Sequence, residues 1–264
     1  LQSTPSKVFD YGMASRGQIL IDGNANIAGV NSDDEASILS ATVLHKDDAI
    51  HIGGNVNISG DLGVTGEEGS VIITGTPTIA GSSDPSTYAD HIHFGVDDPE
   101  FPTVDTSGLA ALATTVVDSS TDVKSEQTWN NIRIAAGTNP NFTSKQILNG
   151  IVYIEAPNIV KFEGQVEING FIVTEDNGSD LDDCQLRFAG GVEAYGVENL
   201  PDTEEFAAVK EQTGTFILAP GFGVTFAGHV TAINGCIATD ELTFTGTAEG
   251  TVRGTLIGLE DLPA

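Results

Sequence analysis

Basic residues are scarce in this sequence. Lys and Arg together number 10 against 38 Asp and Glu, which gives a formal net charge of −28 over 264 residues. A surface this acidic repels the phosphates of nucleic acids and the headgroups of anionic lipids, so we expect neither as a partner. Long apolar runs are also missing, since no stretch approaches the roughly 20 residues of a membrane helix. We therefore expect no membrane span in this chain.

Cysteine is rare as well, with Cys184 and Cys236 as the two examples. The pair is compatible with one disulfide in an oxidising compartment, and equally with two buried free thiols. No signal peptide is visible, and the chain begins at Leu1 rather than Met. We expect a processed or truncated start, with any export signal or anchor upstream, and an extracellular or cell-surface location.

Catalytic signatures are missing too. We find no serine nucleophile elbow, phosphate-cradling loop or dinucleotide fingerprint. The four arginines, which could bind an acidic substrate, lie far apart: Arg16, Arg133, Arg187 and Arg253. Carboxylates are so abundant that finding two together carries little information. We expect no enzymatic activity, and keep a polysaccharide lyase-like enzyme as the least favoured alternative.

What the sequence does contain is an internal repeat. Its pattern is an apolar residue, any residue and Gly, then alternating small or apolar positions that end in a second Gly. The copies are Ile21–Gly29, Ile52–Gly60, Ile73–Gly81, Phe162–Gly170, Phe188–Gly196, a copy from Phe226 with one extra residue, and Phe244–Gly250. The alternation predicts short strands with one face inward, and Gly marks the turns between them.

Repetition with Gly at fixed offsets predicts an all-β, right-handed parallel β-solenoid. A β-sandwich or jelly roll is the alternative, because it is also built from many short strands. The phenylalanines at the first repeat position should form a stacked core ladder: Phe162, Phe188, Phe226 and Phe244. Trp129 is the single candidate for a sugar-stacking platform. Two short helices are expected, at residues 107–117 and 203–210.

Composition divides the chain into three parts. Residues 1–81 form an N-terminal solenoid block, 82–102 a linker or excursion rich in Pro, Ser and Asp, and 103–264 a C-terminal solenoid block. The segment Leu1–Tyr11 contains Pro5 and spaced apolar residues, so we expect it to be extended and able to add to an exposed sheet edge.

Four stretches also carry a family resemblance: VFDYGMASRGQILIDGNANIAG, ATTVVDSSTDVKSEQTWNNIRIAAGTNPNF, NGIVYIEAPNIVKFEGQVEING and GTFILAPGFGVTFAGHVTAINGCIATDELTFTGTAEGTVRG. Together they resemble exported bacterial surface proteins with a PilX-type pilus-assembly N-terminus, which occur in planctomycetes and related bacteria. The resemblance implies a β-rich exported coil that follows a pilin-like helix. That helix is absent here, and the resemblance implies no catalytic residues.

An acidic loop is the candidate metal site. Its carboxylates gather around Asn177 and Gly178, and are Asp176, Asp180, Asp182 and Asp183. Hard oxygen ligands on a Gly-containing loop suit calcium, although the spacing is not that of an EF-hand. The alternative is a solvated acidic loop.

A second candidate metal site is the pair His91 and His93, which would share one face of a strand and could hold zinc or copper with a third ligand from elsewhere. The alternative is a polar strand face.

These features predict an extracellular structural protein, a self-associating solenoid subunit of a surface filament, pilus-like appendage or matrix. The partners would be further copies of the chain, other pilin-like subunits or surface polysaccharide. An open coil ends in unpaired strand edges, and such edges are templates for another copy. The alternative is a module that binds polysaccharide or cations along its acidic faces.

Overall fold

A computed structural model describes residues 6–22, 24–29, 31–42, 49–67, 69–245 and 252–260. The chain forms two compact units, one made of residues 1–103 with 255–264 and the other of residues 104–254. Each unit is a coil of short strands that stack in parallel.

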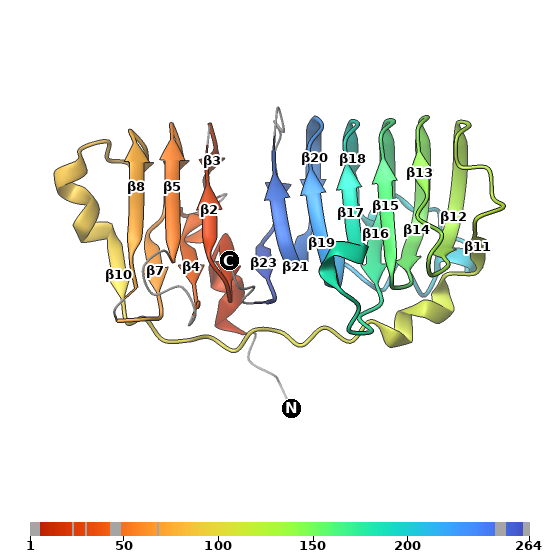
Figure 1. The fold of residues 1–264 in the computed structure, drawn as a ribbon, viewed down its shortest axis with the longest axis horizontal. Coiled ribbons are helices and arrows are strands. Elements are labelled where there is room, and N and C mark those ends of the chain that lie inside the picture. The colour runs from red at the N-terminus through yellow and green to blue at the C-terminus, as the bar shows by residue number, and fades with distance from the viewer. Residues whose placement is uncertain are drawn as a thin grey trace. The chain divides into compact units, whose positions relative to one another are not determined.

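The first unit contains three stacks of strands (Figure 1). One stack runs in the order β23 (Leu256–Gly258), β1 (Met13–Ser15), β4 (Ile38–Ser40), β7 (Leu62–Val64) and β10 (Ile92–Phe94). The second contains β2 (Ile19–Ile21), β5 (Ile50–Gly54) and β8 (Val71–Gly75). The third contains β3 (Asn26–Ile27), β6 (Asn57–Ile58) and β9 (Thr78–Ile79). The chain visits the three stacks in turn, so each circuit is one rung.

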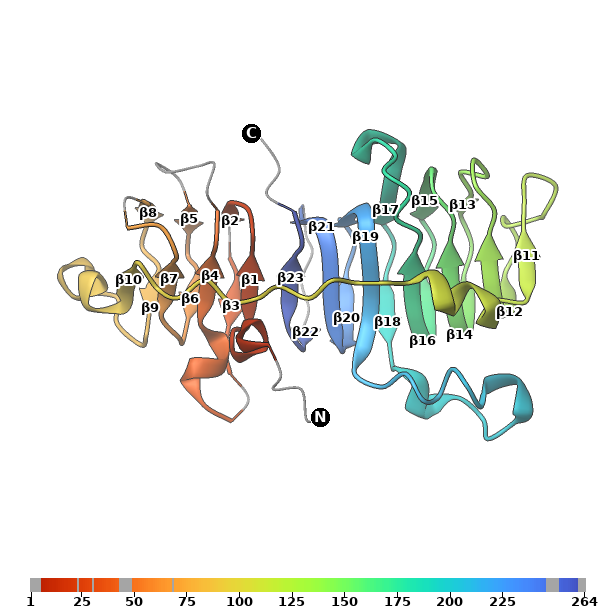
Figure 2. The same cartoon turned by 90° about the horizontal axis from the view of Figure 1, so that it is seen from below.

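The second unit also has three stacks, and its longer strands turn a corner from one stack to the next (Figure 2). Its strands are β11 (Thr115–Val117), β12 (Gln127–Ile134), β13 (Asn141–Phe142), β14 (Gln146–Ile154), β15 (Asn158–Phe162), β16 (Val166–Thr174), β17 (Cys184–Phe188), β18 (Val192–Ala194), β19 (Thr215–Phe226), β20 (Val230–Asn234), β21 (Cys236–Phe244) and β22 (Val252–Arg253). The first stack joins β12, β14, β16, β18, β20 and β22. The second joins β11, β12, β14, β16, β19 and β21, and the third β13, β15, β17, β19 and β21.

The predicted parallel β-solenoid is therefore confirmed, and the β-sandwich alternative is wrong. Every strand pairing that the structure describes is parallel, whereas a sandwich is built from antiparallel hairpins and Greek keys. Among the described residues the one antiparallel contact is an isolated bridge between Ile79 and Ser82.

The inward positions of the repeat form the cores. Ile52, Val56, Ile58, Val166 and Ile168 are at most 2% exposed. Three other positions expected to point inward are not fully buried: Ile27 and Ile73 pack partly buried on the core of the first unit, and Phe244 is 42% exposed, so the expectation is wrong there. Alternation along each strand thus identifies the buried face.

The phenylalanine ladder is confirmed and is longer than predicted, because Phe142 begins it. The rings of Phe142, Phe162, Phe188, Phe226 and Phe244 stack with successive centroid distances of 4.8, 5.3, 4.9 and 5.1 Å. Phe244 lies at the end of the ladder and is 42% exposed. Trp129 meets Phe142 edge-on and is buried, so the prediction of a sugar-stacking platform there is wrong.

Glycines stack at one corner of the second unit because no side chain fits there. A Cβ at Gly190 would lie 1.9 Å from the carbonyl oxygen of Gly164, and a Cβ at Gly228 would lie 2.0 Å from that of Gly190. These three glycines are the third residues of their repeat copies. The repeated Gly therefore records the close approach of one rung's backbone to the next.

An apolar cluster also covers the outside of the second unit. It includes Ile151, Phe171, Phe206 and Val209, with Leu109 packed against it. The covering segments are the two that sequence predicted as helices. Residues 107–112 form a 3₁₀ turn, η4 (Ser107–Leu112), whereas Thr115–Val117 is strand β11; residues 204–206 form another 3₁₀ turn, η7 (Glu204–Phe206). Packing on the coil overrides their helical propensity.

The N-terminal segment differs from the prediction of an edge-seeking strand. Residues 7–10 form a 3₁₀ turn, η1 (Lys7–Asp10), and Val8 is fully buried. Residues 1–5 lie outside the described part. The edge of β1 is occupied by β23, with Ala14 opposite Ile257. Residues 255–264 thus belong to the first unit, as do β10 and the 3₁₀ turn η3 (Pro85–His91) within the predicted linker.

Candidate functional site

Open strand edges lie at one end of the first unit. Within the described residues β8 pairs only with β5, and β10 only with β7. Ile72 on β8 is 37% exposed and Phe94 on β10 is 46% exposed. The core beneath is closed, because Tyr88 of η3 is buried in it and donates a hydrogen bond to the Pro77 carbonyl. This end combines a sealed interior with backbone groups free to pair.

The second unit has an open edge of the same kind. Strand β11 pairs only with the second half of β12 in the part of the chain that the structure describes. Val116 at its centre is 58% exposed, while Val117 is buried in the coil. A strand with one free side and an exposed β-branched residue can accept another strand.

In the acidic loop predicted to bind calcium, two of the aspartates accept hydrogen bonds from backbone amides of the loop itself. Asp176 accepts a hydrogen bond from the Gly178 amide at 3.1 Å, and Asp180 accepts one from the Asp182 amide at 3.0 Å. Asp182 and Asp183 are exposed. In the described chain no three His, Cys, Asp or Glu side chains form a group arranged to hold a metal ion. The four aspartates are thus close in sequence, but their carboxylates do not meet at one point in the structure.

His91 and His93 do meet a third group, Asp61. One carboxylate oxygen of Asp61 lies 2.9 Å from Nδ1 of His91, and the other lies 2.8 Å from Nε2 of His93. Asp61 directly precedes β7, while His93 lies on β10. Partial burial opposes ionisation of Asp61, but the hydrogen bonds from His93 and His91 outweigh it and lower the pKa of the carboxyl. The contact ties the last strand of the stack to its neighbour.

Cys184 and Cys236 are both free thiols in the structure. Cys184 starts β17 and pairs with Asn158 in the third stack, whereas Cys236 starts β21 and pairs with Thr215 in the second. Burial raises the pKa of the Cys236 thiol to about 11. The two cysteines that could have formed a disulfide thus begin strands in different stacks.

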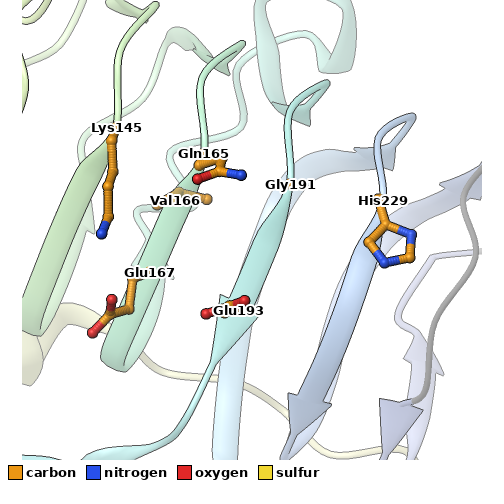
Figure 3. Close-up of a pocket in the computed structure, with 7 residues that line it drawn as sticks. All are labelled: Lys145, Gln165, Val166, Glu167, Gly191, Glu193 and His229. Atoms are coloured by element: carbon orange, nitrogen blue, oxygen red, sulfur yellow. The ribbon is translucent and has the colours of Figure 1, made fainter.

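A polar groove of about 410 Å³ lies on the outer face of the first stack in the second unit (Figure 3). Two rows of side chains form it. The residues of the first row directly precede the strands in sequence, and those of the second row lie on the strands. The strand registers align Lys145, Gln165, Gly191 and His229 in the first row, and Glu167 with Glu193 in the second. In Figure 3 the Lys145 side chain extends along its strand on the side of Glu167.

Tyr195 borders the second row of the groove. Its hydroxyl donates a hydrogen bond of 3.0 Å to Glu193, and its side chain is 38% exposed. This hydrogen bond and the charge of Glu193 raise the pKa of Tyr195. Glu167 in turn accepts a hydrogen bond of 3.1 Å from Asn169. Each carboxylate is therefore oriented by a residue two positions further along the chain.

A smaller hollow of about 200 Å³ lies on the third stack and is lined by Lys161, Glu163, Arg187 and Ala189. Lys161 and Arg187 are in register on adjacent rungs. Neither hollow was predicted from the sequence, because the residues that line each one are distant in sequence and are brought together only by the register of the rungs. Gln165, Glu193 and His229 are examples. The signal was present in the repeat, since aligning its copies places Glu167 and Glu193 at the same position.

The described residues include no helix long and apolar enough to cross a membrane. Comparison of the chain with protein families, with curated proteins and with solved structures finds no match.

Proposed function

We propose that this chain is an extracellular structural protein, a self-associating β-solenoid subunit of a surface filament, pilus-like appendage or matrix. The observation that carries the proposal is the set of open strand edges on β8, β10 and β11. An edge strand presents unpaired N–H and C=O groups, and a second copy can satisfy them by continuing the stack. The partner is therefore another copy of the same chain.

The exposed side chains on these edges favour association. Ile72, Phe94 and Val116 are large apolar residues, each more than a third exposed. Natural edge strands that avoid pairing carry Lys, Pro or inward-pointing charges instead. A second copy that pairs with these edges would continue the ladders, cover Phe94, which is in register with buried Val64, and place its own side chains beside Ile72 and Val116.

Two side-chain ladders, one in the core and one on the outer face of the coil, suit a load-bearing role. Stacked phenylalanines continue from rung to rung, and side-chain amides form a second ladder, in which Asn149 donates to Asn130 and Asn169 donates to Asn149, each at 3.1 Å. Such ladders repeat one interaction along the coil, so each rung stabilises the next. The proposal includes no catalytic step.

Charge sets the conditions under which copies associate. The net charge of −28 opposes contact between copies, and salt or divalent cations screen that repulsion. Calcium enters the proposal in this role, as an ion that neutralises acidic surface. The resemblance to exported surface proteins supports a setting outside the cell, where millimolar calcium is available.

The test is sedimentation velocity with negative-stain microscopy of the purified chain, at low salt, at high salt and in millimolar calcium. We expect oligomers or filaments that grow with screening. Ile72→Asp and Phe94→Asp place a charge on an open edge and should reduce association at least tenfold.

His51→Asp is the matched control. His51 aligns with Ile72 on the same stack, but it lies on β5, which pairs on both sides. Its variant should associate like the wild type. A chain that stays monomeric under every condition, or edge variants that assemble unchanged, would overturn the proposal.

A further inference from the structure

The groove on the first stack of the second unit owes its depth to one missing side chain. In its first row, Gly191 lies between Gln165 and His229, and it has no side chain to fill the interval. A Cβ added at Gly191 would have Gln165 Cγ as its nearest neighbour, at 3.7 Å. Its backbone is not in the left-handed region. Neither strain nor crowding therefore requires Gly here, in contrast to Gly190 beside it.

The groove is lined by polar side chains, of which two are carboxylates. Glu167 and Glu193 are aligned on adjacent rungs, and strands in a sheet lie about 4.8 Å apart. Gln165 adds an amide and His229 an imidazole, while Lys145 is the single cation of the lining. Carboxylates accept strong hydrogen bonds from hydroxyl groups. A ligand rich in hydroxyls satisfies such a lining, and an acidic ligand is repelled by it.

The shape of the groove favours a linear ligand. Its two rows cross from rung to rung, and the carboxylate repeats on two adjacent rungs, so a ligand that lies along the axis of the coil meets both Glu167 and Glu193. Tyr195 stands beside Glu193 with its ring partly exposed, and it can pack against the apolar face of a sugar.

From this arrangement we infer that the groove binds an uncharged polysaccharide, whose chain lies across the rungs with one sugar over Gly191 and its hydroxyls on Glu167 and Glu193. This inference does not depend on self-association, because the groove lies on the outer face of the coil and not on the open edges.

The test is an NMR titration of the isotope-labelled chain, with calorimetry for affinity, performed on the Ile72→Asp variant so that assembly does not interfere. The probes are hexasaccharides of glucose, of N-acetylglucosamine and of galacturonic acid. We expect one or both neutral probes to shift the amides of residues 165–167 and 191–195. The acidic probe should leave them unchanged.

Two substitutions locate the site. Gly191→Thr fills the hollow and should weaken binding at least tenfold, and Glu193→Gln, which removes a charged acceptor, should weaken it roughly tenfold to hundredfold. Gly66→Thr is the control, because a Cβ there also has its nearest neighbour at 3.7 Å but lies in the first unit. All three variants should keep the wild-type unfolding temperature within a few degrees.

Failure of both neutral probes to shift these amides would overturn the inference. Equal binding of the galacturonic acid probe would show that the ligand class is wrong. Unchanged affinity in Gly191→Thr would show that the sugar binds elsewhere.

Discussion

Phe162 and Phe188 stack face to face on adjacent rungs, with ring centroids 5.3 Å apart and planes 9° from parallel. Both side chains are at most 1% exposed. The neighbouring rungs on either side extend the column, since Phe142 stacks on Phe162 and Phe226 stacks on Phe188. Aromatic side chains bury large apolar areas, so this column is a main source of stability in the second unit.

Truncation in the middle of the column should therefore be costly. We expect Phe188→Ala to lower the free energy of unfolding by about 3–5 kcal/mol, because it leaves a cavity between two rings. Phe244→Ala, at the exposed end, should cost less than half as much. Urea unfolding followed by circular dichroism measures both, and equal losses would show that the column is not the source of the difference.

Neighbouring glycines should respond in opposite ways to the same change. Gly190→Ala forces a methyl group against the Gly164 carbonyl at 1.9 Å, and we expect a loss of about 2 kcal/mol or more. Gly191→Ala meets its nearest atom at 3.7 Å and should leave stability unchanged or slightly higher. Comparing unfolding midpoints of the two variants tests whether the corner is packed as described.

Asp61 should give the first unit a small stability that depends on pH. Its pKa is lowered in the folded state, so its contribution is present above the unfolded value of about 4 and is lost as the pH falls below it. Because the side chain is 44% exposed, we expect Asp61→Asn to cost under about 1 kcal/mol at pH 7. The difference from wild type should shrink towards zero between pH 4 and pH 2 in urea titrations. A difference that grows on acidification would contradict the assignment.

The two cysteines should react only after unfolding. Burial raises the pKa of Cys236 to about 11 and desolvation raises that of Cys184, so both remain protonated at pH 8. Iodoacetamide should modify the native protein slowly. In urea without reductant, mass spectrometry should show two alkylated thiols. No alkylation under those conditions would mean that a disulfide had formed.

Much of this architecture follows from the sequence because the repeat encodes local rules. Alternation identified the buried face at Ile52 and Ile168, and the shared first position identified the stacking of Phe162 and Phe188. The first rule acts within one rung, where side-chain periodicity decides burial, and the second follows because equivalent positions of successive copies lie on adjacent rungs.

What the sequence did not reveal depends on contacts between distant segments. Nothing near Met13 indicates that Leu256 will pair beside it, and nothing near His93 indicates that Asp61 will meet it. The phenylalanine at position 142 was missed because its copy of the repeat has Ser144 in place of the first Gly and Gln146 in place of the inward valine. The groove was missed because Gly191 and His229 become neighbours only once the coil is wound.

The segment from Gly196 to Gly214 leaves the coil between β18 and β19 and rests Phe206 on the outside of the rungs. Four of its apolar residues are buried against the coil, namely Val197, Leu200, Phe206 and Val209, and Asn131 donates a hydrogen bond to the Glu205 carbonyl. This segment, the flap, contributes no strand to the coil. It can therefore detach while the rungs keep their hydrogen bonds, and it forms a separate unit of local opening. Amide hydrogens within the flap should exchange with solvent at a lower free energy than those of the rungs beneath it, which should exchange only when the coil itself unwinds.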